Sequence, residues 1–308
     1  MTTAKQHKVS KRSAKRFFST IGMVLILYVL FVLLFPFTFV QYLDITNSEI
    51  LDDNVMYFGI CLLIVTFGTL IPFFLLRLFC KIKVRHFSRS VSASFVELFV
   101  QTIVLFVGVL ILTYVSNIVV SYFGLQGKLI CSIGLYFEDS YLKNLIFVFT
   151  FVAVTPILEE YAFRGVLLNA LGKYGKTFAL YASALLFALA HANFSEMLPA
   201  FAMGFILNKI SFRYKSIVPT ILIHILFNAF LFMLCILPGN VTKYIAYVLV
   251  GISFLALYLI FSGRYQFIKV QKLKTNKANN ILFFTRPTII VSMALMILST
   301  LLFTVFLN

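Results

Sequence analysis

The sequence predicts an all-α, polytopic membrane protein: a bundle of about nine transmembrane helices with its N-terminus inside the cell. Of its 308 residues, 61% are hydrophobic and only 12% are charged, with no Trp and no Gly- or Pro-rich linker. A soluble domain cannot bury that much apolar surface. Several apolar runs are long enough to cross a hydrocarbon core of roughly 30 Å. The chain is therefore expected in a cell membrane, and its Ile-, Phe- and Lys-rich usage favours a bacterial plasma membrane.

The first predicted helix follows a basic cytoplasmic segment, residues 1–16, which has six Lys and Arg and no acidic residue. The apolar run at 17–40 is longer than the apolar region of a signal peptide, about 7–15 residues, and no small-x-small cleavage site follows it. We therefore interpret residues 17–40 as a retained transmembrane helix.

The remaining predicted helices are apolar runs that alternate with polar segments. They lie at residues 55–76, 95–123, 145–171, 177–192, 197–210, 218–237, 244–261 and 288–307. The runs at 177–192 and 197–210 are the shortest. We divide the chain into N-terminal helices (17–140), a core that carries the polar motifs (141–240) and C-terminal helices (241–308).

Charge asymmetry orients these helices. With the N-terminus inside, the predicted outer segments hold only three bases, Lys128, Lys143 and Lys243. The acids outside the apolar runs all fall on the outer side: Asp44, Glu49, Asp52, Asp53, Glu138, Asp139 and Glu196. This is the positive-inside pattern, and it places the C-terminus outside. The net charge of +16 is explained by these inner loops, which could also attract anionic lipid. No basic soluble face is present, so we expect no nucleic-acid partner.

Three ionisable residues interrupt the run at 145–171: Glu159, Glu160 and Arg164. A charge in hydrocarbon costs several kcal/mol unless it is paired or faces water, so such residues indicate function. On a helix, Glu160 and Arg164 lie four apart on one face with the acid first, the favourable order for an ion pair. Glu159 points about 100° away from Glu160 and has no partner in its own helix. A group on another helix should face it.

Further polar residues lie in or at the ends of two later runs. His191 follows Phe187 by four residues, so the Phe ring can pack beside the imidazole. His224 and Asn228 are also four apart and share a helix face. Outside this set, Glu97 is the one other acid within an apolar run, and we interpret it as a structural residue.

These side chains could jointly hydrolyse an amide. Glu159 would take a proton from water, His224 and Asn228 would stabilise the oxyanion, and His191 would orient the water or protonate the leaving amine. Alternatively, Zn²⁺ could bind Glu159, His191 and His224, a two-His-one-Glu set with an open fourth position. No His-Glu-x-x-His motif is present, so any metal site would be assembled across helices. The sequence leaves the metal-dependent and metal-independent mechanisms open.

In order, these motifs are Glu-Glu-x-x-x-Arg (159–164), Phe-x-x-x-His (187–191) and His-x-x-x-Asn (224–228). Together they resemble the CPBP intramembrane protease family, also called the Abi or type II CAAX-protease-like family, over about residues 145–237. The resemblance implies an intramembrane endopeptidase with Glu159 as the catalytic glutamate and Glu160 and Arg164 as its support. His191, His224 and Asn228 would complete the centre. The family is generally described as metalloproteases, whereas a glutamate-activated water has been argued for its CAAX-processing members.

These residues also allow other interpretations. Glu160 and Arg164 could be a purely structural ion pair, and His224 and Asn228 could be interhelical hydrogen-bond partners. The chain could be a non-proteolytic scaffold or bacteriocin-immunity protein of the same family, or an ion-coupled transporter. As an enzyme, its partners would be a membrane-associated peptide or protein substrate and the lipid bilayer; the sequence indicates no oligomeric state.

One geometric problem accompanies the catalytic hypothesis. Counted at about 1.5 Å per residue from the outer ends of their helices, Glu159 lies nearer the inner face and His191 nearer the outer face. A helix kink at Pro156 could bring the two side chains to the same depth in the membrane. We expect Glu159, His191, His224 and Asn228 to surround one cavity within the membrane.

Overall fold

The computed structural model describes residues 11–46, 54–84, 95–125, 141–237 and 277–306, with scattered positions between 239 and 258. Within these ranges the chain forms helices and no strand, so the predicted all-α class is confirmed. The helices, with η for π-helical segments, are α1 (Lys11–Tyr28), η1 (Val29–Leu34), α2 (Phe35–Ile45), α4 (Asn54–Phe79), α5 (Phe95–Tyr122), α6 (Tyr141–Phe149), η3 (Thr150–Val154), α7 (Thr155–Glu159), η4 (Glu160–Leu167), α8 (Leu168–Gly172), α9 (Lys176–Ala190), α10 (Phe194–Tyr214), α11 (Val218–Ile236), α13 (Lys277–Phe284) and α14 (Pro287–Phe306).

Five helical stretches of the described chain are long and apolar enough to cross a membrane, and each coincides with a predicted span. They are Lys11–Phe39, Leu62–Phe79, Leu98–Tyr122, Asn144–Gly172 and Pro287–Val305. Lys176–Ala190 and Val218–Leu234 are shorter apolar helices. The protein is thus a multi-pass helical membrane protein, as predicted. The predicted span at 244–261 and the basic residues 1–10 lie outside the described residues, at least in part.

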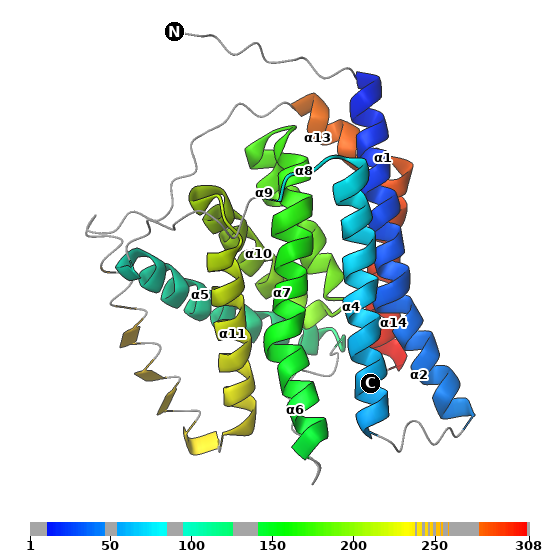
Figure 1. Ribbon diagram of the computed structural model, residues 1–308. Coiled ribbons are helices and arrows are strands. Elements are labelled where there is room, and N and C mark those ends of the chain that lie inside the picture. Colours follow the sequence, from blue (N-terminus) through cyan, green and yellow to red (C-terminus); the bar gives the residue numbers. More distant parts are fainter. Residues whose placement is uncertain are drawn as a thin grey trace.

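The helices pack in a continuous bundle. α1 packs against α4 and α14, α10 packs against both α5 and α9, and α11 contacts η3, α7 and α10. Figure 1 shows α1, α4 and the stretch from α6 to α7 running along one direction, with α5 inclined across them. The stretch from α6 through α8, which carries the Glu-Glu-x-x-x-Arg motif, therefore lies at the centre of the bundle.

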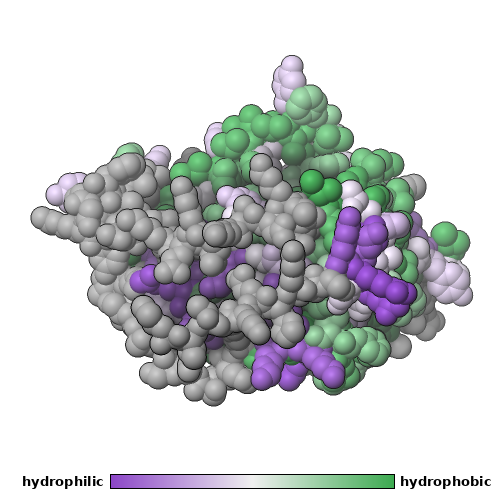
Figure 2. Space-filling view, turned by 90° about the horizontal axis from the view of Figure 1, so that it is seen from above, coloured by the Kyte–Doolittle hydropathy of each residue, from purple (hydrophilic) through white to green (hydrophobic). Residues whose placement is uncertain are grey.

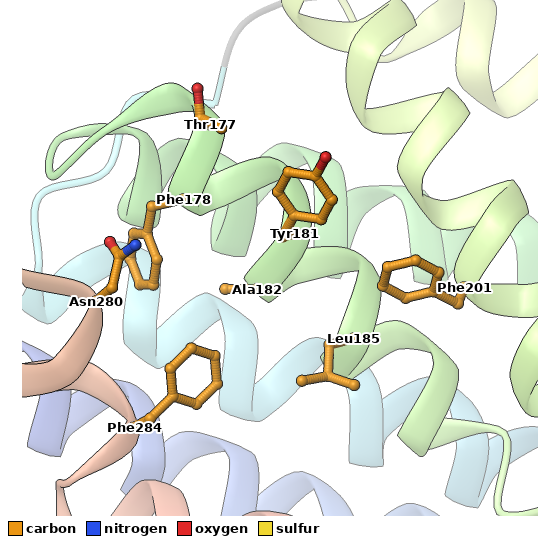
Figure 3. Close-up of a pocket in the computed structure, with 8 residues that line it drawn as sticks. All are labelled: Thr177, Phe178, Tyr181, Ala182, Leu185, Phe201, Asn280 and Phe284. Atoms are coloured by element: carbon orange, nitrogen blue, oxygen red, sulfur yellow. The ribbon is translucent and has the colours of Figure 1, made fainter. Parts of the chain in front are cut away.

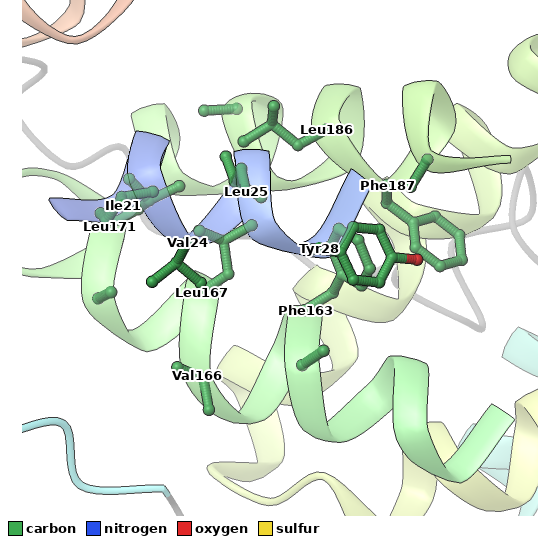
Figure 4. Packing of buried hydrophobic residues seen from close by; sticks show 14 of the residues in the cluster. Ile21, Val24, Leu25, Tyr28, Phe163, Val166, Leu167, Leu171, Leu186 and Phe187 are labelled. Carbon is green, nitrogen blue, oxygen red and sulfur yellow. The ribbon is translucent and has the colours of Figure 1, made fainter. Parts of the chain in front are cut away.

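Aromatic rings join this central stretch to α1, α4 and α9. The ring of Tyr28 on α1 lies 5.6 Å from that of Phe73 and 6.1 Å from that of Phe163, in edge contacts. Phe163 in turn lies 5.1 Å from Phe187 on α9. Figure 4 shows Tyr28, Phe163 and Phe187 grouped at one end of this packed layer. Edge-to-face packing fixes the relative orientation of aromatic rings, so α1, η4 and α9 are held in register here.

Helices α9 and α10 form a tight hairpin. His191 is the C-cap of α9, Ala192 has a left-handed backbone (φ 49°), and Asn193 caps α10 by accepting a hydrogen bond from Ser195 N at 2.9 Å. Along the hairpin, Nδ2 of the fully buried Asn208 donates to Leu180 O at 3.0 Å. At 15 residues α9 is about 22 Å long, short of the roughly 30 Å hydrocarbon core.

The end of the bundle that holds the α8–α9 turn also holds the end of α4 and the start of α1 (Figure 1). Lys173 in this turn donates from Nζ to Cys80 O at 3.1 Å, just beyond α4. Figure 2, which views this end, shows hydrophilic side chains on it. These positions agree with the segments that the positive-inside pattern predicts to be cytoplasmic.

Gly204 lets α10 approach α9. A Cβ added there would lie 2.9 Å from Phe187 Cδ1 and 3.5 Å from Arg164 Nη2, whereas one added at Gly108 of α5 would meet nothing within 4 Å. Replacing a helical Gly with Ala normally favours the helix by about 0.5–1 kcal/mol. We predict that Gly108→Ala leaves stability unchanged or raised, whereas Gly204→Ala lowers it by about 1–3 kcal/mol through overpacking. Unfolding in detergent micelles measures both, and an equal response of the two variants would contradict this packing.

Candidate active site

A cavity of about 510 Å³ lies among α1, α4, α5, α7, α10 and α11. Glu159, His191, His224 and Asn228 all line it, so the structure brings these four predicted site residues together. Most of the remaining wall is apolar, with Val32, Val65, Val109, Leu110, Met203, Phe227, Leu231 and Leu234 among its side chains. The other two predicted residues, Glu160 and Arg164, do not line the cavity and are fully buried.

Glu160 and Arg164 form the ion pair that their spacing predicts. Arg164 Nη1 donates to Glu160 Oε1 at 2.8 Å, and neither side chain is exposed. His224 Nδ1 lies 2.9 Å from the same carboxylate oxygen. Because a carboxylate accepts hydrogen bonds, Nδ1 of His224 is the donor in this contact. The pair therefore fixes both the orientation of the His224 ring and the nitrogen that carries its anchoring proton.

Glu159 has the different environment expected from its position on the helix. Its side chain is 20% exposed, and its Oε2 lies 3.7 Å from Nε2 of His224. That separation exceeds a hydrogen-bond length, so the contact is electrostatic. The group that faces Glu159 from another helix, which the sequence analysis required, is thus His224. Of the two adjacent carboxylates, one is held by fixed partners and the other opens to the cavity.

The backbone around the motif is π-helical on both sides of α7. η4 begins at Glu160 and ends at Leu167. The side chain of Asn169 donates to Arg164 O at 3.1 Å and to Gly165 O at 2.8 Å, and so satisfies carbonyls of this widened turn. The guanidinium of Arg164 lies over the Phe187 ring, 4.2 Å from its centroid, a cation–π contact in a desolvated site. π-Helical turns of this kind occur often at functional sites.

Pro156 explains the contact that Asn228 makes. In η3 the N–H of Thr155 bonds to Thr150 O, five residues back. In this pattern Phe151 O would pair with the nitrogen of residue 156, which is Pro and has no N–H. Asn228 Nδ2 instead donates to Phe151 O at 3.0 Å. The proline thus creates a free carbonyl that fixes the Asn228 side chain at the cavity wall.

His191 is anchored by its own helix. The backbone N–H of His191 bonds to Ala188 O at 3.2 Å, and its ring Nδ1 lies 2.8 Å from Phe187 O. A carbonyl only accepts, so Nδ1 carries a proton and Nε2 is the nitrogen left for chemistry. The Phe187 ring packs edge-on against the imidazole, with centroids 4.7 Å apart, as the sequence spacing predicts.

The depth problem is resolved by the short helix α9. Counted from the shared α8–α9 turn, Glu159 lies 13 residues before Gly172 and His191 lies 15 residues after Lys176. At 1.5 Å per residue these positions are about 20 Å and about 22 Å from the turn. The difference in depth counted from the outer helix ends was wrong, because His191 ends a helix that is too short to cross the hydrocarbon core.

The cavity is also lined by polar residues that were not predicted as site residues: Tyr28, Thr69, Thr113, Asn117, Thr155, Ser195 and Glu196. Glu196 was assigned to an outer segment, but it lies in the first turn of α10. The spacing of Asn193 and Glu196, an acid three residues after an N-cap residue, is a helix-start signal that could have placed it. Tyr28 and Asn117 lie in apolar runs, where nothing in the sequence distinguishes them.

The zinc alternative does not fit the described residues. Among them, no group of three or more His, Cys, Asp or Glu side chains is arranged to hold a metal ion. Glu159, His191 and His224 line one cavity without converging as ligands on a common point. We therefore derive no catalytic step through a metal.

A second cavity, of about 300 Å³, lies between α9, α10 and α13. Figure 3 shows Phe178, Leu185, Phe201 and Phe284 around it, with Asn280 at one side. It is lined by none of the six predicted site residues, so the first cavity is the candidate site.

Residues 141–230 match the model of the family described as type II CAAX prenyl endopeptidase Rce1-like. The resemblance predicted from the motifs is confirmed for this segment. It contains all six predicted site residues.

One curated relative is the UPF0177 protein YaiF of Lactococcus lactis subsp. lactis (strain IL1403). It is 34% identical over 99 residues, which are 31% of this chain and 44% of the relative. The match thus spans less than half of that protein. No solved structure matches the chain.

The buried ion pair generates a stability prediction. Removing one partner of such a pair leaves an uncompensated buried charge and costs about 3–5 kcal/mol. We expect Arg164→Met to destabilise the protein by this amount, and the double variant Glu160→Gln with Arg164→Met to recover part of the loss. Unfolding in detergent micelles measures both variants. Additive losses in the double variant would show that the two side chains are energetically independent.

Proposed function

We propose that the protein is an intramembrane endopeptidase that hydrolyses a peptide bond of a membrane-associated protein or peptide. The observation that carries this proposal is that Glu159, His191, His224 and Asn228 line one cavity between helices long and apolar enough to cross a membrane. The likeness of residues 141–230 to a family of endopeptidases supports the same reaction class. The absence of an activated Ser or Cys from the predicted set favours direct attack by water.

In the first step, Glu159 acts as the general base. Its carboxylate is accessible from the cavity and takes a proton from water, while the water oxygen bonds to the scissile carbonyl carbon. The carbonyl oxygen becomes an oxyanion. One proton of Asn228 Nδ2 is donated to Phe151 O, and the other can be donated to the oxyanion. His224 can donate from Nε2 when both ring nitrogens are protonated.

In the second step, the C–N bond breaks and the leaving amine takes a proton. His191 can supply it from Nε2 when both of its ring nitrogens are protonated, while its Nδ1 stays anchored on Phe187 O. The proton that Glu159 took from water then passes to Nε2 of His191, which restores the starting state. One water is consumed and two termini are formed, so the atoms and charges balance.

The cavity walls favour a substrate with apolar side chains around the scissile bond, since most lining residues are aliphatic or aromatic. In a bacterium, a peptide pheromone, a bacteriocin leader or a segment of a membrane protein meets this description.

A metal-dependent mechanism would need ligands beyond the arrangement seen here, so we expect activity to persist in the presence of a strong zinc chelator.

Substitution of the cavity carboxylate tests the proposal. We expect Glu159→Gln to lower cleavage by about 10²–10⁴-fold, because the general base is lost. Asn228→Ala should lower it by about 10²–10³-fold through loss of an oxyanion donor. Peptidomics of cells that express each variant identifies the products, and purified protein in lipid vesicles confirms the rates. Glu97→Gln, the matched acid-to-amide change at a residue predicted to be structural, should leave cleavage unchanged.

The same experiment separates the alternatives. The biological effect could persist in Glu159→Gln with no cleavage product that depends on the wild-type chain. That result would refute the peptidase hypothesis and indicate a scaffold or a bacteriocin-immunity protein. Ion-coupled flux in the vesicles would instead indicate a transporter.

A further inference from the structure

The second cavity, between α9, α10 and α13, takes no part in the reaction described above. Phe178, Leu185 and Phe201 are among the apolar residues of its wall. Tyr181, which also lines it, is 53% exposed, so the cavity opens on the outside of the bundle. Along α9 it extends from Thr177 to Leu185, about 12 Å at 1.5 Å per residue. The cavity is therefore an elongated, mostly apolar groove.

The groove starts at the end of the bundle that is predicted to be cytoplasmic. Thr177 follows Lys176, the residue at which α9 begins after the α8–α9 turn. The last part of α10 lies at the same end, because a Cβ added at Gly172 in the turn would lie 3.5 Å from Phe212 Cζ. Leu185 lies about two helical turns further along α9. The groove thus runs from the membrane surface towards the bilayer interior.

Basic side chains lie beside the cytoplasmic end of the groove. Lys176 Nζ is 6.0 Å from the ring centroid of Phe212, and Lys209 Nζ is 4.9 Å from that of Phe205. The Phe205 ring in turn lies 5.0 Å from the ring of Tyr181 in the groove wall. Lys side chains can cover apolar surface with their methylene stems while the ammonium stays at the membrane surface. The mouth of the groove is therefore flanked by cations.

The three helices around the groove carry an excess of positive charge. All ten Asp and Glu residues of the chain lie at or before Glu196. α9 and α13 therefore have Lys but no acid, and α10 has only Glu196, at its opposite end from Lys209 and Arg213. An anionic ligand would complement this charge, and the cytoplasmic leaflet supplies anionic headgroups at this depth.

Asn280 of α13 adds a polar group that the described protein does not satisfy. It lines the groove, and its Oδ1 is buried without a hydrogen-bond partner among the described residues. A buried acceptor in this state costs free energy that a ligand with a donor would recover. Figure 3 shows the hydroxyls of Thr177 and Tyr181 on one side of the view, and Leu185 and Phe284 on the opposite side. The groove is thus amphipathic along its length.

We propose that this groove binds one anionic phospholipid of the cytoplasmic leaflet. Its phosphate would lie near Lys176, and a headgroup hydroxyl, such as those of phosphatidylglycerol, would donate to Asn280 Oδ1. An acyl chain would lie along Phe178 and Leu185. A basic surface alone attracts anionic lipids without fixing them, whereas the groove adds apolar contacts that hold one molecule. The bound lipid would join α13 to α9, the helix that ends at His191.

Because the chain has no Trp, a single introduced Trp can report which lipid occupies the groove. Tyr181→Trp places this fluorophore in the groove wall, and Tyr114→Trp is the matched control on α5, where Tyr114 is 70% exposed. Each full-length variant is reconstituted in vesicles of phosphatidylcholine and phosphatidylglycerol, with quenching bromine atoms on the acyl chains of one lipid or the other. We expect Tyr181→Trp to show a preference of about 25-fold for phosphatidylglycerol, about fivefold for each nearby Lys. Tyr114→Trp should show a preference below about twofold.

Further substitutions in the Tyr181→Trp protein test the headgroup contacts. We expect Lys176→Gln to lower the preference for phosphatidylglycerol about fivefold. Asn280→Leu, which keeps the approximate size of the side chain, should lower it about two- to tenfold by removing the hydrogen bonds. Lys83→Gln is the matched control, since Lys83 is an exposed base that follows α4 at the same end of the bundle, and it should leave the preference unchanged.

Three results would overturn the proposal. Equal preferences in Tyr181→Trp and Tyr114→Trp would show that the groove selects no lipid. An equal effect of Lys83→Gln and Lys176→Gln would show general attraction to a basic surface. If neither lipid quenched Tyr181→Trp and chemical cross-linking gave a dimer, a second copy of the chain would cover the groove instead. None of these measurements uses cleavage, so the lipid site and the proposed peptidase function are tested independently.

Discussion

The buried ion pair of Glu160 and Arg164 is the constraint on which the site depends. Both side chains are withdrawn completely from solvent, so each charge is the compensating partner of the other in a desolvated site. The bond from His224 Nδ1 to the same carboxylate brings a third helix into the arrangement. Since His224 also faces Glu159, the orientation of the proposed general base and the stability of the pair are set by the same few contacts.

The π-helical backbone around α7 also fixes other side chains of the cavity. The π-helical segments η3 and η4 flank the single turn α7, so Glu159 projects from a short regular piece between two widened ones. Pro156 removes an N–H, and Asn228 uses the carbonyl that this leaves free. A regular α-helix would satisfy its own carbonyls and leave Asn228 without this anchor. The deviation from ideal helix geometry is thus what positions a polar side chain in an apolar wall.

Much of the fold could be predicted because the bilayer leaves few alternatives. Apolar runs of sufficient length become helices, and the runs at 17–40, 55–76, 95–123, 145–171 and 288–307 did so. The i, i+4 pairs Glu160–Arg164 and Phe187–His191 could also be predicted, since helix geometry places such residues side by side. What the residues do in a reaction stays a prediction.

Other features could not be predicted because they depend on where helices end and how they meet. The run at 177–192 is short in the sequence, but the pattern does not show from which membrane face its residues should be counted, and this changes the depth expected for His191. Glu196 looked like an outer acid because its apolar run begins at Met197, yet α10 begins at Phe194. Tyr28 faces the cavity only because α1 packs beside α4 and η4, a tertiary contact with no local signature.

The two histidines show how a site in an apolar environment can fix its proton positions. Each uses Nδ1 for an anchor, the Glu160 carboxylate for His224 and the Phe187 carbonyl for His191. Both anchors accept hydrogen bonds, so both rings keep a proton on Nδ1 and leave Nε2 for the cavity. The partners nearest each ring differ, however: His224 lies between two glutamates of one helical stretch, whereas His191 shares the cavity with Glu196 across a hairpin. Two chemically identical side chains therefore have different anchors and different acidic neighbours in the same cavity, so one can face the oxyanion while the other faces the leaving amine.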